Sequence, residues 1–413
     1  MSTSPYARDL IAALPKSDLH CHLDGSLRLQ TLIELAKARE VQLPSYTPDG
    51  LLELVFKESY RDLPEYLHGF GYTCSVLDNE EALERVAYEL AVDCLAEGTR
   101  YLEVRFAPQL HIRPSMSLDA VLSAVDRGLD RARREHEHSD AVKVHGEPPF
   151  RYGIICCAMR MFTKGFGPWF ADLFRALDQW PAKQVYGTAS LTLARQVVDV
   201  RERLGLPIVG FDLAGAEAGH PASDHAAAFS YVHKHFLKKT VHAGEAYGPE
   251  SIFQAITRLN ADRIGHGTRL FEWESVQAGD DPRRYVQQLT EYIADRRVML
   301  EVCVTSNMQT MPHLRRVEDH PFGRMVQERL SVTICTDNRL VSRTSCTDEL
   351  LKVSEAFQLK PHELRNVVLH GFKRSFYAGS YLEKRAYVRQ VIDYYDKVAR
   401  QHGVPITERG EGQ

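Results

Sequence analysis

The amino-acid sequence predicts a (β/α)₈ barrel, also called a TIM barrel, with extra helices after the first strand and at the C-terminus. Eight short apolar or β-branched runs alternate with long amphipathic stretches, an order that favours a parallel sheet closed on itself. The chain has 413 residues, of which 44% are hydrophobic and 26% charged, enough for one elaborated barrel with a sizeable core. We therefore expect a single domain over residues 1–413.

The predicted strands follow one another along the chain and are separated by helical patterns. The strands cover residues 17–23, 100–108, 151–159, 208–215, 239–245, 262–267, 298–306 and 331–337. Asn79 precedes one helical stretch that has acidic residues in its first turn and stops at Gly98, which are start and stop signals of a helix. Residues 26–99 are expected to form a helical cap over one barrel end. Further helices are expected from about residue 361, and a surface loop over 136–150.

Composition gives no indication of a nucleic-acid or membrane partner. The net charge is −4 and the pI is near 6.5, so no basic surface is implied. The N-terminal stretch lacks the pattern of a signal peptide, and no apolar run approaches the ~18 residues of a membrane span. The eight cysteines are scattered without a Cys-x-x-Cys motif, which favours buried thiols in a reducing compartment. We expect a cytoplasmic protein, whose oligomeric state the sequence leaves open.

Three His-x-His pairs occur, and one of them is expected to bind a metal. Alternate residues point to the same side of a strand but about 200° apart on a helix, so only a strand can direct both rings to one ion. The pairs at 136–138 and 233–235 fall in helical patterns. His136 and His138 are expected to favour the dipole at a helix end, and His233 and His235 to have a surface or packing role. His20 and His22 instead end the first predicted strand, where barrel enzymes keep their active sites.

Ionisable side chains end four of the predicted strands. They are His20, His22, His242, Glu245, His266 and Asp337. A barrel brings the C-terminal ends of its strands to one face, so these groups should converge there. Burying them together would be costly without an ion or a reaction, which favours a functional site over separate core residues.

Three imidazoles and one carboxylate suit zinc with an open position for water. The expected ligands of one ion per chain are His20, His22, His242 and Asp337. A metal there lowers the pKa of water from about 15.7 toward about 7. His266 would then take the proton of the water or hold the hydroxide, and Glu245 would donate a proton to the electrophile. Strand 208–215 has no lysine to bridge two metals. These residues predict metal-dependent hydrolysis and leave zinc open against another divalent ion.

The motifs, taken in order, resemble those of the adenosine deaminase family within the amidohydrolase superfamily. They are "DLHCHLDGS", "LPEYLHGF", "YLEVRFAP", "GFDLAGAE", "VHAGE", "RIGHG", "EVCVTSN" and "TDN", and they span nearly the whole chain. The resemblance implies a zinc-containing barrel that replaces the 6-amino group of a purine by oxygen. Adenosine, and with it 2′-deoxyadenosine, would become inosine or its deoxy form with release of ammonia, so the expected partner is a small purine nucleoside.

The resemblance also implies roles for individual residues. Glu245 is similar to the proton donor to ring N1, and His266 to the residue beside the attacking hydroxide. Gly215 is similar to the backbone contact to ring N3, and Asp24 to the aspartate that binds a ribose hydroxyl. An apolar gate over the substrate is matched by Leu63, Tyr66, Leu67 and Phe70. Near the site, the resemblance also places Met159 and Arg160.

One departure from the family pattern concerns substrate choice. Many members have a second aspartate after the metal-binding one, whereas this chain has Asn338 and then Arg339. The resemblance implies that the second aspartate donates a hydrogen bond to purine N7 when protonated. An amide donates without protonation, so Asn338 is expected to do the same. Arg339 and Arg343 are either solvated or structural, or meet an anionic 5′ group. The alternatives to adenosine are adenine, adenosine monophosphate or a 5′-modified adenosine such as aminodeoxyfutalosine, and, from another class, a non-catalytic binding protein.

Overall fold

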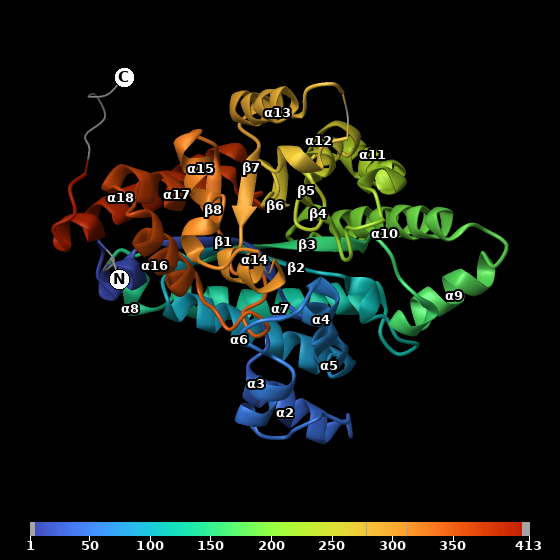
Figure 1. Ribbon diagram of the computed structural model, residues 1–413. Coiled ribbons are helices and arrows are strands. Elements are labelled where there is room, and N and C mark those ends of the chain that lie inside the picture. Colours follow the sequence, from blue (N-terminus) through green and yellow to red (C-terminus); the bar gives the residue numbers. More distant parts are fainter. Residues whose placement is uncertain (1–4, 278, 312, 407–413) are drawn as a thin grey trace.

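Eight parallel strands follow one another around a barrel in the computed structural model, which describes residues 5–277, 279–311 and 313–406 (Figure 1). Each strand pairs with the next one in sequence. The strands are β1 (Lys16–His22), β2 (Thr99–Phe106), β3 (Arg151–Met159), β4 (Ile208–Ala214), β5 (Lys238–Ala243), β6 (Arg263–His266), β7 (Met299–Val302) and β8 (Val332–Ile334). The predicted fold class is confirmed. The first four residues of the N-terminal stretch, which lacks the pattern of a signal peptide, lie outside the described residues.

The barrel closes at two of the predicted metal ligands. The backbone N–H of His22 donates to the carbonyl of Asp337, and the N–H of Asp337 donates to the carbonyl of His20, each at 2.7 Å. These bonds form an isolated parallel bridge between Cys21 and Asp337, just beyond the end of β8. The first strand is therefore joined to the residues after the last strand at the predicted metal ligands.

Helices surround the barrel and fill the connections. Those that follow β1 are α2 (Leu29–Ala38), α3 (Pro48–Leu54), α4 (Leu63–His68), α5 (Phe70–Ser75) and α6 (Glu80–Ala96). The remaining α-helices are α1 (Arg8–Ala13), α7 (Leu118–Glu137), α8 (Asp140–Lys143), α9 (Pro168–Ala176), α10 (Ala182–Leu204), α11 (Ala226–Lys234), α12 (Pro249–Arg258), α13 (Pro282–Arg296), α14 (Val304–Thr310), α15 (Phe322–Gln327), α16 (Cys346–Phe357), α17 (Pro361–Arg374) and α18 (Tyr381–Gln401). In Figure 1, α2 to α5 lie together beneath the strands, and α2 and α3 are farthest from them.

Local signals set both ends of α6 as the sequence predicts. The side chain of Asn79 accepts a hydrogen bond from the N–H of Ala82 and so caps α6. Gly98 follows that helix with φ = 90°, and a Cβ there would lie 2.4 Å from the carbonyl of Ala12. No helix among the described residues is both long and apolar enough to cross a bilayer.

Two boundaries differ from the prediction. Strand β7 ends at Val302, and α14 begins at Val304, so the second half of the predicted strand 298–306 is helical. Its valines and threonine favour a strand locally, but tertiary context overrides this weak preference. The predicted loop 136–150 contains the end of α7 and the single turn of α8, where Asp140 occupies the first helical turn and favours the helix dipole.

Candidate metal centre and active site

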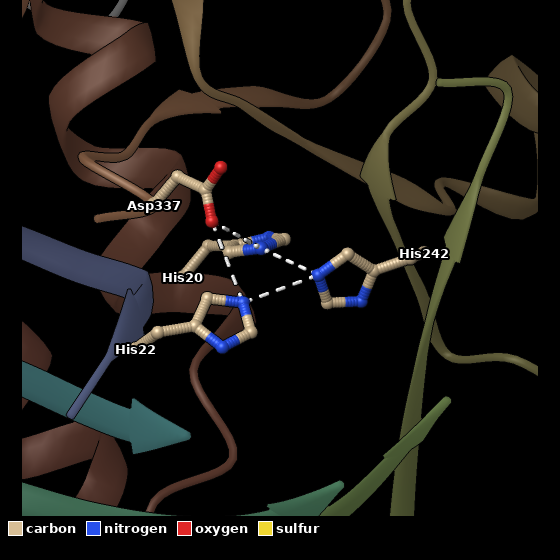
Figure 2. Close-up of side chains that lie close together, drawn as sticks. All are labelled: His20, His22, His242 and Asp337. Atoms are coloured by element: carbon tan, nitrogen blue, oxygen red, sulfur yellow. Dashed lines mark hydrogen bonds and ion pairs between the residues drawn. The ribbon is translucent and has the colours of Figure 1, made fainter. Parts of the chain in front are cut away.

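The four predicted metal ligands converge at the C-terminal end of the barrel (Figure 2). The Nε2 atom of His242 lies 3.0 Å from Nε2 of His20 and 3.2 Å from Nε2 of His22. Oδ1 of Asp337 lies 3.5 Å and 3.4 Å from the same two atoms of His20 and His22. For bonds of about 2.0–2.1 Å, the edge of a tetrahedral zinc site is about 3.3 Å long. The spacing of the four atoms therefore fits one such ion.

Hydrogen bonds behind two of the rings turn their Nε2 atoms toward this centre. Nδ1 of His20 donates to the carboxylate of Glu301 at 3.0 Å, and Nδ1 of His242 donates to Asp212 at 3.0 Å. With their hydrogens on Nδ1, neutral rings present two lone pairs to each other across 3.0 Å. That contact is repulsive unless a cation lies between them. The donor set thus fits a metal ion, and the two carboxylates orient its ligands.

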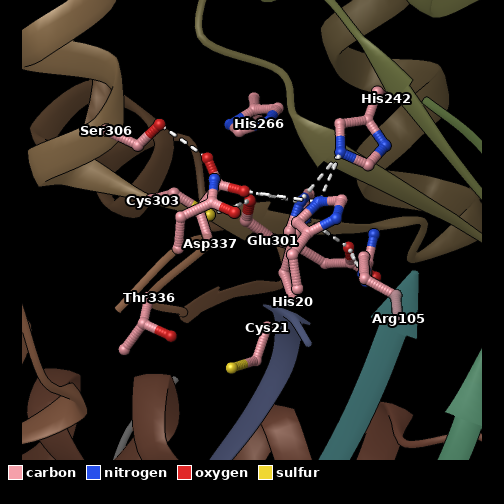
Figure 3. Close-up of polar contacts among 12 residues, drawn as sticks. His20, Cys21, Arg105, His242, His266, Glu301, Cys303, Ser306, Thr336 and Asp337 are labelled. Atoms are coloured by element: carbon pink, nitrogen blue, oxygen red, sulfur yellow. Dashed lines mark hydrogen bonds and ion pairs between the residues drawn. The ribbon is translucent and has the colours of Figure 1, made fainter. Parts of the chain in front are cut away.

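Sequence reasoning did not single out Glu301 on β7 or Asp212 on β4, although both lie inside the quoted motifs. Each is a fully buried acid in the middle of an apolar strand. Arg105, from β2, is equally buried and donates to both, at 3.0 Å to Asp212 and at 2.7 Å to Glu301. Figure 3 shows Arg105 and Glu301 beside His20. A buried acid in such a strand is the signal that could have found them, because burial of a charge requires a partner.

The side chain of Asp337 is oriented by a hydrogen bond, and its backbone has an uncommon conformation. Its Oδ2 accepts a hydrogen bond from Ser306 Oγ at 2.6 Å, which leaves Oδ1 facing the histidines (Figure 3). Its backbone has φ = 61°, a left-handed conformation that is uncommon for a residue other than glycine. Such conformations cost about 1–3 kcal/mol and persist where surrounding structure enforces them, often at functional sites.

Glu245 lies next to the metal-binding group in a loop that a second glutamate organises. Glu217 accepts hydrogen bonds from four consecutive backbone N–H groups, those of residues 244–247, and from Ser251. Burial raises the pKa of Glu245 to about 7. The Glu245 carboxyl can therefore carry a proton at neutral pH. Glu217 was not predicted, although it follows Gly215 in one of the quoted motifs.

His266 lies beside the same rings, with Nε2 3.8 Å from Oε1 of Glu245. Its ring centroid is 4.8 Å from that of His20. A Cβ at Gly265 would lie 2.8 Å from the His20 ring, so the glycine before His266 permits this close approach. Burial lowers the pKa of His266 to about 4, which keeps its ring neutral.

A cavity of about 600 Å³ opens onto these groups and is lined by every residue that the sequence assigned to substrate binding. This size lies within the range of small-molecule sites. The lining residues predicted from sequence are Asp24, Leu63, Tyr66, Leu67, Phe70, Gly215 and Asn338. Gly215 has φ = 94°, which favours glycine. Asp24 is buried with its Oδ1 unpaired among the described residues, and burial raises its pKa to about 7.

A hydrogen bond connects Tyr66 of the predicted gate to Asn338, the residue that departs from the family pattern. Asn338 Nδ2 donates to the hydroxyl of Tyr66 at 2.7 Å, and that hydroxyl is 2.7 Å from Ser342 Oγ. Tyr66 belongs to α4, whereas Asn338 follows the predicted metal ligand Asp337. The amide nitrogen has two hydrogens, so one remains for a bound molecule.

The other residues considered from the sequence have mainly structural contacts. Arg160 donates to the carbonyls of His242 and His220, each at 2.6 Å, whereas Met159 lines the cavity. Arg339 forms an ion pair with Glu97. Arg343 lies 3.6 Å from the exposed Glu58.

The other two His-x-His pairs lie at or near helix ends, as the sequence predicts, but two of the four rings contact other segments. Nδ1 of His136 accepts a hydrogen bond from the backbone N–H of Phe150 at 3.2 Å, and Nδ1 of His235 lies 3.6 Å from Glu202 of α10. His138 lies at the end of α7, where its Nδ1 donates to the carbonyl of Arg134 at 2.7 Å. His233 is exposed on α11.

Comparison with known proteins identifies the family. The family model for adenosine deaminase matches residues 15–164 and 185–394. The chain belongs to the adenosine deaminase family. An adenosine deaminase of Mycolicibacterium vanbaalenii is 35% identical over 393 residues, which cover 94% of this chain and 97% of that protein. The expected family and a hydrolytic deaminase activity are thereby confirmed.

Two solved structures share this fold over nearly the whole chain. An adenine deaminase from Arthrobacter aurescens superimposes with a TM-score of 0.70 at 21% identity, covering 93% of this chain and 100% of that one. An amidohydrolase from Burkholderia ambifaria, with bound Zn, gives a TM-score of 0.72 at 18% identity and covers 98% of both chains. At such identities the likeness shows the fold alone.

Proposed function

We propose that this protein is a zinc-dependent adenosine deaminase that converts adenosine, and 2′-deoxyadenosine, to inosine or its deoxy form and ammonia. One observation carries the proposal: three Nε2 atoms and one carboxylate oxygen that fit a single metal lie beside a buried glutamate whose pKa is raised to about 7, in a cavity of about 600 Å³. Membership of the adenosine deaminase family and the names of its relatives support it.

Zinc would be held by the four converging side chains His20, His22, His242 and Asp337. When bound, it supplies a nucleophile at neutral pH by lowering the pKa of water. Glu301 and Asp212 keep the histidine lone pairs directed at the ion through their bonds to Nδ1. Neutral imidazoles and an ionised carboxylate are the forms in which these residues bind a metal.

The side chains around the metal site would bind the purine ring and transfer a proton to it. Glu245, protonated near neutral pH, donates to N1, so that C6 becomes electron-poor enough for attack. His266 lies next to Glu245 and assists the attacking oxygen. On the other side of the ring the backbone of Gly215 would meet N3, and the free amide hydrogen of Asn338 would meet N7.

Another residue that lines the cavity supports a ribose. The unpaired Oδ1 of Asp24 is an acceptor for a sugar hydroxyl. Leu63, Leu67 and Phe70 line the cavity as an apolar cover that excludes water from the reaction. Free adenine would leave Asp24 unpaired in a buried site, which is unfavourable, so adenosine fits better than adenine.

The test is conversion by purified protein of known metal content. Adenosine, 2′-deoxyadenosine, adenine, adenosine monophosphate and 5′-modified adenosines are compared by loss of the adenosine absorbance band and release of ammonia. The proposal expects about one zinc per chain and the highest kcat/KM with adenosine. Faster turnover of another amino-purine would assign that compound as the substrate and would still support hydrolytic deamination. No turnover of any of them by zinc-loaded protein would contradict the proposal.

A further inference from the structure

A chain of hydrogen bonds runs from His266 into the segments that connect β7 to β8. Nδ2 of Asn307 lies 3.1 Å from Nδ1 of His266, and Oδ1 of Asn307 lies 3.2 Å from Nε2 of His320. Nδ1 of His320 lies 3.1 Å from the backbone nitrogen of Phe322. The three side chains are 0–2% exposed. Asn307 belongs to α14 and His320 precedes α15, so two connecting segments build this chain.

The backbone amide at its far end determines the direction of every bond. The N–H of Phe322 can only donate, so Nδ1 of His320 must accept. Burial lowers the pKa of His320 to about 3, so the ring is neutral and has its single hydrogen on Nε2. That hydrogen is donated to Asn307, which makes the facing atom the amide oxygen. The amide nitrogen of Asn307 is thereby turned toward His266.

An amide nitrogen donates and does not accept, so Nδ1 of His266 must be the acceptor. The neutral ring then has its hydrogen on Nε2, the nitrogen that lies 3.8 Å from the Glu245 carboxyl. We infer that Asn307 and His320 are positioning residues that fix His266 in its Nε2–H tautomer, so that His266 donates a hydrogen bond to the attacking oxygen and does not take a proton from it. The tautomer follows from the contacts alone, whereas the attacking oxygen rests on the proposed function.

The opposite assignment would leave two donors facing each other. A His266 that acts as general base needs its lone pair on Nε2, which places the hydrogen on Nδ1. That hydrogen would then face the amide hydrogens of Asn307 across 3.1 Å in a buried site. Rotating the amide of Asn307 would relieve this contact but would turn its nitrogen toward the Nε2–H of His320. The chain is therefore satisfied in one direction only.

Nitrogen NMR of histidine-labelled protein tests the tautomer, because an imidazole N–H and a lone-pair nitrogen have different ¹⁵N shifts. His266→Gln identifies the resonances of His266 by their disappearance. In the wild-type protein, with and without zinc, Nε2 should carry the hydrogen. Asn307→Asp replaces the donor by a carboxylate of the same shape, which accepts from Nδ1–H, so the pattern should reverse. In a serine protease, reversing the tautomer of the catalytic histidine lowers kcat by about 10⁴.

For Asn307→Asp we therefore expect kcat to fall by about 10²–10⁴ with the zinc content unchanged. A matched pair at His320 tests the same chain one residue further away. His320→Gln keeps a donor toward Asn307 and an acceptor for Phe322, so the His266 pattern and kcat should stay close to wild type. His320→Glu offers only acceptors, so the amide of Asn307 should rotate and the His266 pattern should reverse. If Asn307→Asp does not fold, this pair of His320 variants still tests the tautomer of His266.

Thr310→Val is the control on α14, because the Thr310 hydroxyl donates only to carbonyls of its own helix. It should change neither the NMR pattern nor kcat. An Nδ1–H pattern in the wild type, or an unchanged pattern in both Asn307→Asp and His320→Glu, would overturn the tautomer, even if no deaminase activity were found. If a variant has the Nδ1–H form of His266 but full kcat, the proposed role of His266 in the reaction is wrong, whereas the tautomer assigned to the wild type still holds.

Discussion

His20 and His242 are each held from behind by a buried carboxylate, whereas Leu63, Tyr66 and Leu67 project from a six-residue helix outside the barrel. The first group lies on strands that are joined to their neighbours by backbone hydrogen bonds. The second belongs to the connection between β1 and β2 and contacts the site through apolar surface and the bond from Tyr66 to Asn338.

This difference separates chemistry from substrate choice. Atoms that bind a metal must be placed within a few tenths of an ångström, and rigid strands with oriented ligands provide that. A cover over the substrate has only to exclude water and match a shape, and short helices can do so while retaining motion. Changes at the strand ends should therefore abolish the reaction, and changes in the cover should alter which purine reacts.

The largest effect is expected for His242→Ala. It removes one of three imidazoles, so the metal should be lost and activity should fall to the background rate. Metal analysis and adenosine turnover measure both. His233→Ala, an exposed histidine on α11, is the matched control and should behave as wild type. Full zinc content together with full turnover in His242→Ala would show that His242 is not a ligand.

Glu245→Gln should keep the metal and lose roughly 10²–10⁴ in kcat, because the amide cannot transfer a proton to N1. Steady-state kinetics on zinc-loaded protein measures this change. The exposed Glu274→Gln serves as control. Turnover equal to wild type would remove Glu245 from the role of proton donor.

Glu301→Gln tests whether the barrel interior orients the ligands. Zinc affinity should fall about 10- to 100-fold, measured by competition with a chelator, because Nδ1 of His20 loses its carboxylate. The variant should also be destabilised by about 3–5 kcal/mol, since Arg105 and Arg263 lose a buried partner. Leu67→Ala in the cover should leave zinc affinity unchanged. Equal zinc affinity in Glu301→Gln and Leu67→Ala would show that the strands and the cover do not differ in their effect on metal binding.

The pH dependence should follow Glu245. Burial raises its pKa to about 7, and the protonated form is the one that donates. Protonated Glu245 is present below that pKa and lost above it, so kcat/KM should fall about tenfold per pH unit on the alkaline side of about pH 7. A rate profile from pH 5 to 9 measures the decline. A kcat/KM that rises through pH 8 would contradict this assignment.

The smallest effect is expected for Asn338→Asp. A carboxylate accepts from the Tyr66 hydroxyl but donates to purine N7 only when protonated, so kcat/KM for adenosine should fall by up to about tenfold near neutral pH. Zinc content and the ranking of His242→Ala and Glu245→Gln should not change. Kinetics with adenosine and with 7-deazaadenosine, which lacks N7, isolates this bond. An equal loss for both substrates would show that Asn338 acts on the gate through Tyr66.

The sequence by itself determined the eight-stranded order and the residues at the strand ends. Strand geometry explains why: the period of two places His20 and His22 on one side, and parallel strands bring His242 and Asp337 to the same end. The gate residues and Asn338 came from the family resemblance, and all of them line the cavity.

Only the tertiary structure decided which groups stand behind the site residues. These groups bind partners that can lie far away in the sequence: Glu301 is 281 positions from His20, to which it is hydrogen-bonded. The groups are Glu301, Asp212, Glu217, Asn307 and His320. A buried acid in an apolar strand or a histidine before a helix has many possible partners along the chain. Closure of the barrel between β1 and the residues after β8 selects one of them, because a buried donor or acceptor is stable only where the folded chain places its complement.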